Sequence, residues 1–155
     1  MAKLHYLTVQ DILWINLQAT KKVQHFSYAK LEEATYYQYA YGESNELIGQ
    51  AARFHSGFVK MRPIESGNEA TAFIGLATFL HINGLRLAVE DERAAAWAQN
   101  ASVSTDAARE ALLSATETED DHHSPIRPDI RAAIRGVMEQ YPTTIASLLA
   151  APVPV

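Results

Sequence analysis

Residues 62–68, Arg-Pro-Ile-Glu-Ser-Gly-Asn, place a cation, a carboxylate, a hydroxyl and an amide directly before a long apolar run. Gly67 tolerates a positive φ and Ser66 supplies a side-chain turn bond, so this stretch predicts a tight turn. Asn68 is a good N-cap, because its side-chain oxygen can accept a bond from a backbone N–H two or three residues on. A turn that opens a helix presents free N–H groups and the positive end of the helix dipole. The chemistry expected is binding of an anion or nucleotide by Ser66, Gly67, Asn68 and Thr71.

The element that must position this turn is a helix expected from Glu69 to Asn83. The run contains no proline, and its apolar residues occur nearly all round, which is typical of a helix buried in a core. Gly84 follows as the left-handed residue expected just past a helix end. The pattern fits a capped core helix that binds nothing equally well, and the sequence leaves both interpretations open.

Several ionisable side chains lie close to the turn in sequence. Arg62 could hold a phosphate or a carboxylate, and Glu65 or Glu69 could act as a base, since two carboxylates near one cation can take different protonation states. His55 stands seven residues before Arg62, on roughly the same helix face, and is a candidate for a displaced base. The competing interpretation of His55, and of His81 on the core helix, is a packing or capping histidine.

The stretch resembles the signature of the Fic/Doc family (filamentation-induced-by-cAMP and death-on-curing proteins). The family pattern runs His-Pro-Phe-x-(Asp/Glu)-Gly-Asn-(Gly/Lys)-Arg-Thr and continues into an apolar helix that ends in Asn-Gly. The positions of this chain that match are Pro63, Gly67, Asn68, Thr71, Ala72, Phe79, Leu80, Asn83 and Gly84. The resemblance extends over roughly residues 7–116, and its specific part is residues 62–84.

The departures from the family pattern fall on the chemistry. Arg62 stands where the family has its catalytic His, and Ser66 stands where it has the carboxylate that holds Mg²⁺. Ala70 replaces the phosphate-binding Arg, and Glu69 replaces Gly or Lys. A guanidinium keeps its proton far above pH 7, so Arg62 cannot be the general base. A serine is a poor ligand for Mg²⁺, which prefers carboxylates.

The family activity that the resemblance implies is transfer of AMP or phosphate to a protein hydroxyl. The departures make this transfer improbable, so no catalytic residue is expected to be intact. ATP and Mg²⁺ would be cofactors only if the activity survives, and no other cofactor and no metal site is expected. Pairing of Arg62 with Glu69 or Glu65 would fill the anion position from within, and this state is favoured because an intramolecular carboxylate needs no association entropy.

Composition bounds the remaining function classes. The chain has 155 residues, of which 48% are hydrophobic and 20% charged, which fits a globular protein with a substantial core. It has no cysteine, which excludes disulfides and thiolate chemistry. The net charge of −5 does not indicate the basic surface that proteins use to bind nucleic acid. The apolar run from Ala70 to Leu80 is too short to span a bilayer, which takes about 20 residues. The start lacks a signal-peptide pattern, so a cytoplasmic protein without a membrane partner is expected.

The fold class expected is all-α, a Fic/Doc-like bundle of about six helices around the Glu69–Asn83 helix. We expect a helical domain over residues 1–116, a charged linker over 117–127 and a C-terminal helix and tail over 128–155. In the linker, Asp120 to His123 form only a weak metal-binding pattern. An apolar stripe on the helix expected at 129–141 must dock on the body, on a second copy as a homo-oligomer, or on another protein; it consists of Ile130, Ile134, Val137, Met138 and Tyr141.

Two classes of function remain. The first is a Fic/Doc-like protein that has lost catalysis and acts by binding a protein partner or an antitoxin-like peptide, in a toxin–antitoxin-like system. The second is an enzyme of altered phosphoryl or nucleotidyl transfer that uses Arg62, Glu65 and Glu69 at the same loop.

Overall fold

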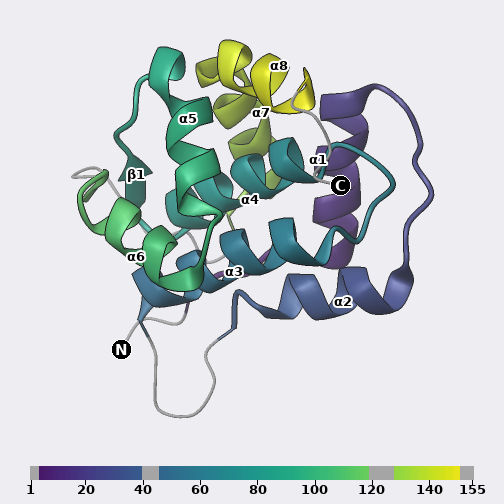
Figure 1. Cartoon of the computed structure of the whole chain (residues 1–155), viewed down its shortest axis with the longest axis horizontal. Coiled ribbons are helices and arrows are strands. Elements are labelled where there is room, and N and C mark those ends of the chain that lie inside the picture. Colours follow the sequence, from purple (N-terminus) through teal and green to yellow (C-terminus); the bar gives the residue numbers. More distant parts are fainter. Residues whose placement is uncertain (1–3, 40–45, 119–127, 151–155) are drawn as a thin grey trace.

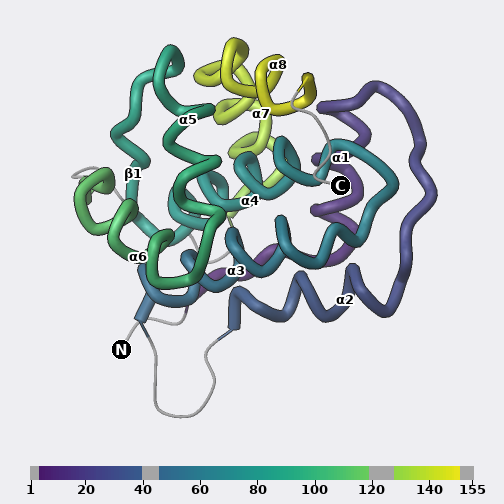
Figure 2. Tube along the Cα trace, viewed as in Figure 1, coloured from purple at the N-terminus to yellow at the C-terminus, as the bar shows by residue number. Residues whose placement is uncertain are grey.

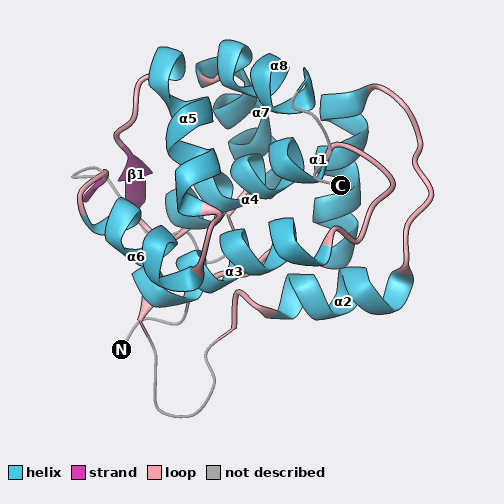
Figure 3. Cartoon of the chain, viewed as in Figure 1, coloured by secondary structure: helices cyan, strands magenta, loops and turns pink. Residues whose placement is uncertain are grey.

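The computed structural model describes residues 4–39, 46–118 and 128–150, and within these ranges the fold is all-α. The described residues form eight helices and one antiparallel pair of short strands (Figures 1 and 3). Six of the helices lie before residue 116, as expected, and the C-terminal part has two helices instead of the one expected. The helices are α1 (Val9–Thr20), α2 (Tyr28–Tyr36), α3 (Leu47–Met61), α4 (Asn68–Ile82), α5 (Asp91–Ala101), α6 (Thr105–Leu113), α7 (Ile130–Gln140) and α8 (Pro142–Ala150). The strands are β1 (Leu85–Leu87) and β2 (Thr116–Thr118).

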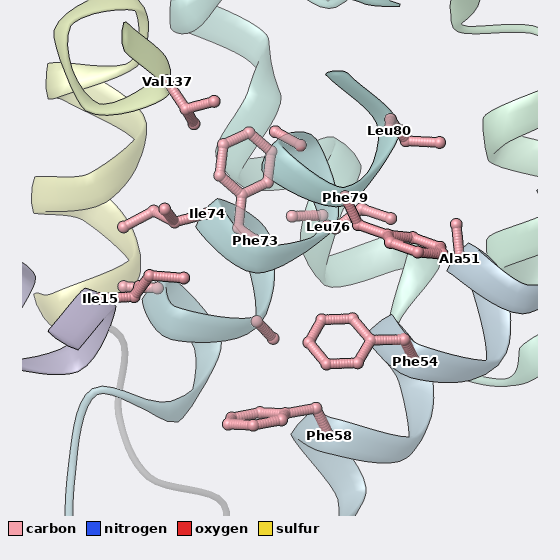
Figure 4. Packing of buried hydrophobic residues seen from close by; sticks show 14 of the residues in the cluster. Ile15, Ala51, Phe54, Phe58, Phe73, Ile74, Leu76, Phe79, Leu80 and Val137 are labelled. Atoms are coloured by element: carbon pink, nitrogen blue, oxygen red, sulfur yellow. The ribbon is translucent and has the colours of Figure 1, made fainter. Parts of the chain in front are cut away.

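Helix α4 is the centre of the fold, as its composition predicts. Thirteen of its fifteen residues are buried, and α1, α3, α7, α8 and β1 all pack against it (Figure 1). Its aromatic side chains fill different sides of the core: Phe73 points toward α7 and Phe79 toward α3 (Figure 4). Gly84 follows the helix with φ of 89°, the left-handed conformation expected there.

The helix starts that the sequence predicts from local capping patterns are present for α1 and α2. Thr8 and Asp11 form a reciprocal capping box at the start of α1. The Ser27 side chain accepts a bond from the Lys30 N–H at the start of α2. The sequence suggests Ser44 as the cap of a third helix from Asn45, and this is wrong: α3 begins at Leu47, and its N-cap is Glu46, which makes no side-chain cap bond.

The segment before α1 is extended but pairs with side chains instead of a strand. The His5 N–H donates to Asn83 Oδ1 (2.7 Å), and Asn83 Nδ2 donates back to the His5 carbonyl (2.9 Å). Gln38 does the same for Leu7, with distances of 2.7 and 2.6 Å. Two amide side chains therefore satisfy the backbone groups that a neighbouring strand would otherwise satisfy.

The two C-terminal helices dock on the body of the chain. Ile134 and Val137 of α7 lie in the same hydrophobic cluster as the residues of α4. Tyr141 packs edge-on against Phe73, and its hydroxyl donates to the backbone carbonyl of Val89 (2.7 Å). Of the three docking targets that the sequence leaves open, the buried residues of the stripe therefore use the body itself.

Pro142 begins a helix, although the sequence suggests that it only ends one and that the residues after it add a turn or two. Proline is well tolerated at a first helical position, where its missing N–H has no partner to lose. Asp91 then caps α8 from another helix, because its carboxylate accepts bonds from the N–H groups of Thr143 (3.1 Å) and Thr144 (2.8 Å). Burial raises the pKa of Asp91, but the bonds from Thr144 and Thr143 outweigh that effect and hold it below its ordinary value.

None of the helices in the described parts of the chain is long and apolar enough to cross a membrane.

Candidate functional site

The loop that joins α3 to α4 is fixed at both ends by residues of positive φ. Arg62 ends α3 with φ of 48° and ψ of 60°, and its N–H donates to the Phe58 carbonyl (3.0 Å). Gly67 precedes α4 with φ of 78°. Only glycine adopts this conformation without strain, so Gly67 is placed where the turn needs it.

Asn68 is not the N-cap that the sequence predicts. It is the first residue of α4, Gly67 occupies the cap position, and no side chain caps the helix start. The Asn68 side chain instead turns back into the loop, where Oδ1 accepts from the Ile64 N–H (3.1 Å) and Nδ2 donates to the Ile64 carbonyl (2.6 Å). The prediction fails because Cβ bonds in a helix tilt toward its N-terminus, and the loop offers two unpaired backbone groups in that direction.

The other side of the loop pairs with the segment between α1 and α2, which runs beside it (Figure 2). The Ser27 N–H donates to the Pro63 carbonyl (2.9 Å), and the Glu65 N–H donates to the His25 carbonyl (2.8 Å). The Glu65 side chain is exposed, and its Oε2 accepts a long bond from the His25 N–H (3.4 Å). Glu65 is therefore directed to the α1–α2 segment rather than to Arg62.

A residue that the sequence did not single out, Asn16 of α1, holds the loop and the helix together. Its Nδ2 donates to the Ser66 carbonyl (2.9 Å) and to Thr71 Oγ1 (3.1 Å), and both Asn16 and Thr71 are buried. The available signal was an amide four residues after Ile12 on the apolar face of α1. Two of the four predicted anion-binding residues, Ser66 and Thr71, are therefore hydrogen-bonded to the Asn16 side chain.

The start of α4 is also closely covered on the side of Gly67. A Cβ placed on Gly67 would lie 2.6 Å from Thr20 Cγ2, 3.1 Å from Asn16 Nδ2 and 3.6 Å from Leu149 Cδ2. The first distance is shorter than any real Cβ contact, so only glycine fits here. Helices α1 and α8 thus cover Gly67 on the side where a Cβ would lie.

Arg62, at the end of α3, and Glu69, in the first turn of α4, form an ion pair between Nη1 and Oε1. Their side chains are 24% and 18% exposed, so the pair is partly shielded from water. Glu69 is the second residue of α4, where its negative charge also meets the positive end of the helix dipole. This is the arrangement expected when the anion position is filled from within, with Glu69 and not Glu65 as the occupant.

His55 lies in the core, away from the loop. Seven residues correspond to about 10 Å along a helix axis, and the ring is 1% exposed. Its Nε2 lies 3.1 Å from the Ala98 carbonyl of α5, and Nδ1 has no hydrogen-bond partner. Because a carbonyl can only accept, Nε2 carries the proton in this contact. Burial lowers the pKa of His55, with partial opposition from the backbone of Ala98 and Ala72, so the ring is neutral at pH 7.

A neutral buried histidine makes stability depend on pH. The unfolded chain binds a proton at His55 near pH 6.5, whereas the folded chain does so only at lower pH. The free energy of unfolding should therefore fall as the pH drops from about 7 to about 5, by at most about 1.4 kcal/mol per pH unit from this group. Urea unfolding at several pH values should show this slope in the wild type and a smaller one in His55→Gln. The exposed His25→Gln variant should keep the wild-type slope, and an unchanged slope in His55→Gln would contradict the assignment.

No set of three His, Asp or Glu residues that could hold a metal ion occurs in the described parts of the chain. The weak pattern at Asp120 to His123 lies outside them. Comparison with protein-family models, curated proteins and solved structures finds no match to this chain.

Proposed function

We propose that this chain is a Fic/Doc-like protein that has lost nucleotidyl and phosphoryl transfer and acts by binding a protein partner. The observation that carries this proposal is the Arg62–Glu69 ion pair, which puts a protein carboxylate where a phosphate would have to enter. A phosphate group would have to displace Glu69 from Arg62 and then lie beside the displaced negative charge. Both steps oppose binding of an ATP-like ligand.

The remaining polar groups of the loop support the same proposal. Asn68 uses both ends of its amide on Ile64, and Asn16 engages Ser66 and Thr71. The amide side chains of Asn68 and Asn16 are thus engaged within the protein instead of on a phosphate. These bonds instead hold the loop in one conformation. A fixed loop suits a surface that a partner protein binds better than an active site that binds and releases a nucleotide.

The partner class proposed is a protein or an antitoxin-like peptide in a toxin–antitoxin-like system, in the cytoplasm. The net charge of −5 and the absence of cysteine are the sequence features that support this placement. Self-association through residues 129–141 would have to use the outer face of α7, because Ile134 and Val137 are buried against the body.

The second candidate is an enzyme of altered phosphoryl or nucleotidyl transfer at the same loop. The observation in its favour is the contact of Arg62 with Glu69, a cation and a carboxylate that are both partly exposed. It would require the ion pair to open, and it would work without Glu65, whose carboxylate faces His25. A ligand that opens the pair would be the first requirement of this candidate, and phosphate titration measures it directly.

We expect phosphate to cause no shift in the amide signals of Asn68 to Thr71 in the wild type and a saturable shift in Glu69→Ala. Removing the Glu69 carboxylate frees Arg62, and the helix dipole adds about half a positive charge at the same point. Two-dimensional NMR with phosphate titrated at constant ionic strength makes the measurement.

Glu65→Ala is the matched control, since it removes a carboxylate of the same loop that does not pair with Arg62, and it should behave like the wild type. A strong response of the wild type would mean that Glu69 does not fill the position. A lack of response in Glu69→Ala would mean that the loop has no anion site.

A further inference from the structure

A pocket of about 370 Å³ lies beside the loop, between α1, the segment that follows it and the first turn of α7. Its apolar wall comes from α1, from the segment before α2 and from one residue of the α3–α4 loop, and it consists of Leu13, Trp14, Leu17, Val23, Phe26 and Ile64. Figure 1 shows that segment running alongside α1 toward α2. Pockets that hold small molecules have about 300–1,000 Å³ and are mostly apolar with a few polar groups, so this one is of suitable size.

The pocket is lined in part by apolar side chains that are exposed to water. Among the described residues eight large apolar side chains are exposed, and three of these, Leu17, Val23 and Phe26, line this pocket. Exposed apolar side chains scattered singly need no explanation, whereas a cluster around a concavity marks a binding surface. Burying them requires an apolar occupant.

The charges at the pocket are all of one sign. Lys22 and Arg131 both line it, and no Asp or Glu does, although the chain has 18 acidic residues. Neither cation forms an ion pair within the part of the chain that the structure describes. The Arg131 guanidinium lies 4.3 Å from the centre of the Trp14 ring, which holds it at the pocket while leaving its N–H groups free for an acceptor.

We propose that this pocket binds a small organic carboxylate with an aromatic or branched apolar body. The apolar body would lie against Leu17, Val23 and Phe26, and the carboxylate would accept bonds from Lys22 and Arg131. A folded protein partner would need about 800 Å² of contact on this side, far more than one such pocket provides. The site is separate from the loop position, because Arg62 and Glu69 do not line it, and it therefore goes beyond the proposed function and stands or falls independently of it.

The test compares three probes that differ only in their head group: 4-phenylbutyrate, its neutral amide and 4-phenylbutylamine. The chain has two tryptophans, so a Trp97→Phe background makes Trp14 fluorescence the reporter of the pocket. We expect 4-phenylbutyrate to change that fluorescence saturably, the amide to bind about fivefold to tenfold more weakly because it lacks a charge-assisted bond, and the amine not to bind detectably.

Variants of the cations locate the interaction. Lys22→Gln and Arg131→Gln should each weaken 4-phenylbutyrate binding about fivefold or more while leaving the weaker amide binding unchanged. Arg135→Gln, an exposed arginine one turn further along the same helix that does not line the pocket, should leave both unchanged. Because Arg131 touches Trp14, amide shifts of residues 22–26 serve as the second readout for that variant, and circular dichroism checks that each variant folds.

Equal affinity for the acid, the amide and the amine would overturn the proposal, since the pocket would then be an apolar cavity without selection for an anion. Absence of binding by all three probes, up to their solubility, would overturn it as well. Binding of the acid that survives in Lys22→Gln and Arg131→Gln would place the carboxylate elsewhere, and it too would contradict the assignment.

Discussion

Replacement of Asn68 by alanine is expected to lower the free energy of unfolding by about 2–4 kcal/mol, because two buried backbone groups would each lose their partner. The N–H and the carbonyl of Ile64 both bond to the Asn68 side chain, and Ile64 is 3% exposed. Water cannot readily replace an amide at such a position. Urea unfolding followed by circular dichroism measures the loss.

The control for Asn68→Ala is Asn100→Ala on α5, where the side chain is exposed. It should change stability by less than about 0.5 kcal/mol. If Asn68→Ala were equally mild, the loop would hold its shape without Asn68, and this residue would be free for another role. A large loss supports the view that Asn68 maintains the loop rather than binding a ligand.

Local patterns predicted a substantial part of this fold. The composition of residues 69–83 is enough to place a buried helix, since few surface residues interrupt it. Caps such as Thr8 and Ser27 act within three residues of themselves, so the sequence contains all of their partners. The left-handed residue Gly84 follows from the same short-range logic.

Contacts between distant segments were not predictable in this way. Asn16 bonds to residues 50 and 55 positions away, and nothing in the periodicity of α1 indicates that its amide meets the loop. Strands β1 and β2 pair although about thirty residues separate them. Helix α8 depends on a cap from Asp91, more than 50 positions earlier, so its extent cannot be inferred from its own residues.

At the candidate site, too, the contact between residues close in sequence was predictable, whereas the pocket built from distant segments was not. The sequence identified Arg62 and Glu69 as possible partners because seven residues on a short loop keep them close, and the structure has them in contact. The apolar pocket was missed, because four separate segments contribute its walls. Its only local signals were Val23 and Phe26, two apolar residues in the short segment between α1 and α2.

The second large effect expected concerns catalysis itself. Transfer of AMP or phosphate needs a general base, and losing one typically costs 10²–10⁴ in rate. Arg62 cannot accept a proton at neutral pH, Ser66 cannot replace a carboxylate on Mg²⁺, and Ala70 offers no phosphate bond. Because these deficits act together, transfer should fall below detection rather than merely slow down.

The most direct test of the account is incubation of the purified chain with labelled ATP and Mg²⁺, alone and with added protein acceptors. We expect no label in any protein above a sample without the chain, both for the wild type and for Glu69→Ala, in which Arg62 is freed. Incorporation by the wild type that disappears in Arg62→Gln but persists in Arg86→Gln, an exposed arginine on β1, would contradict it and show that the loop is an active site.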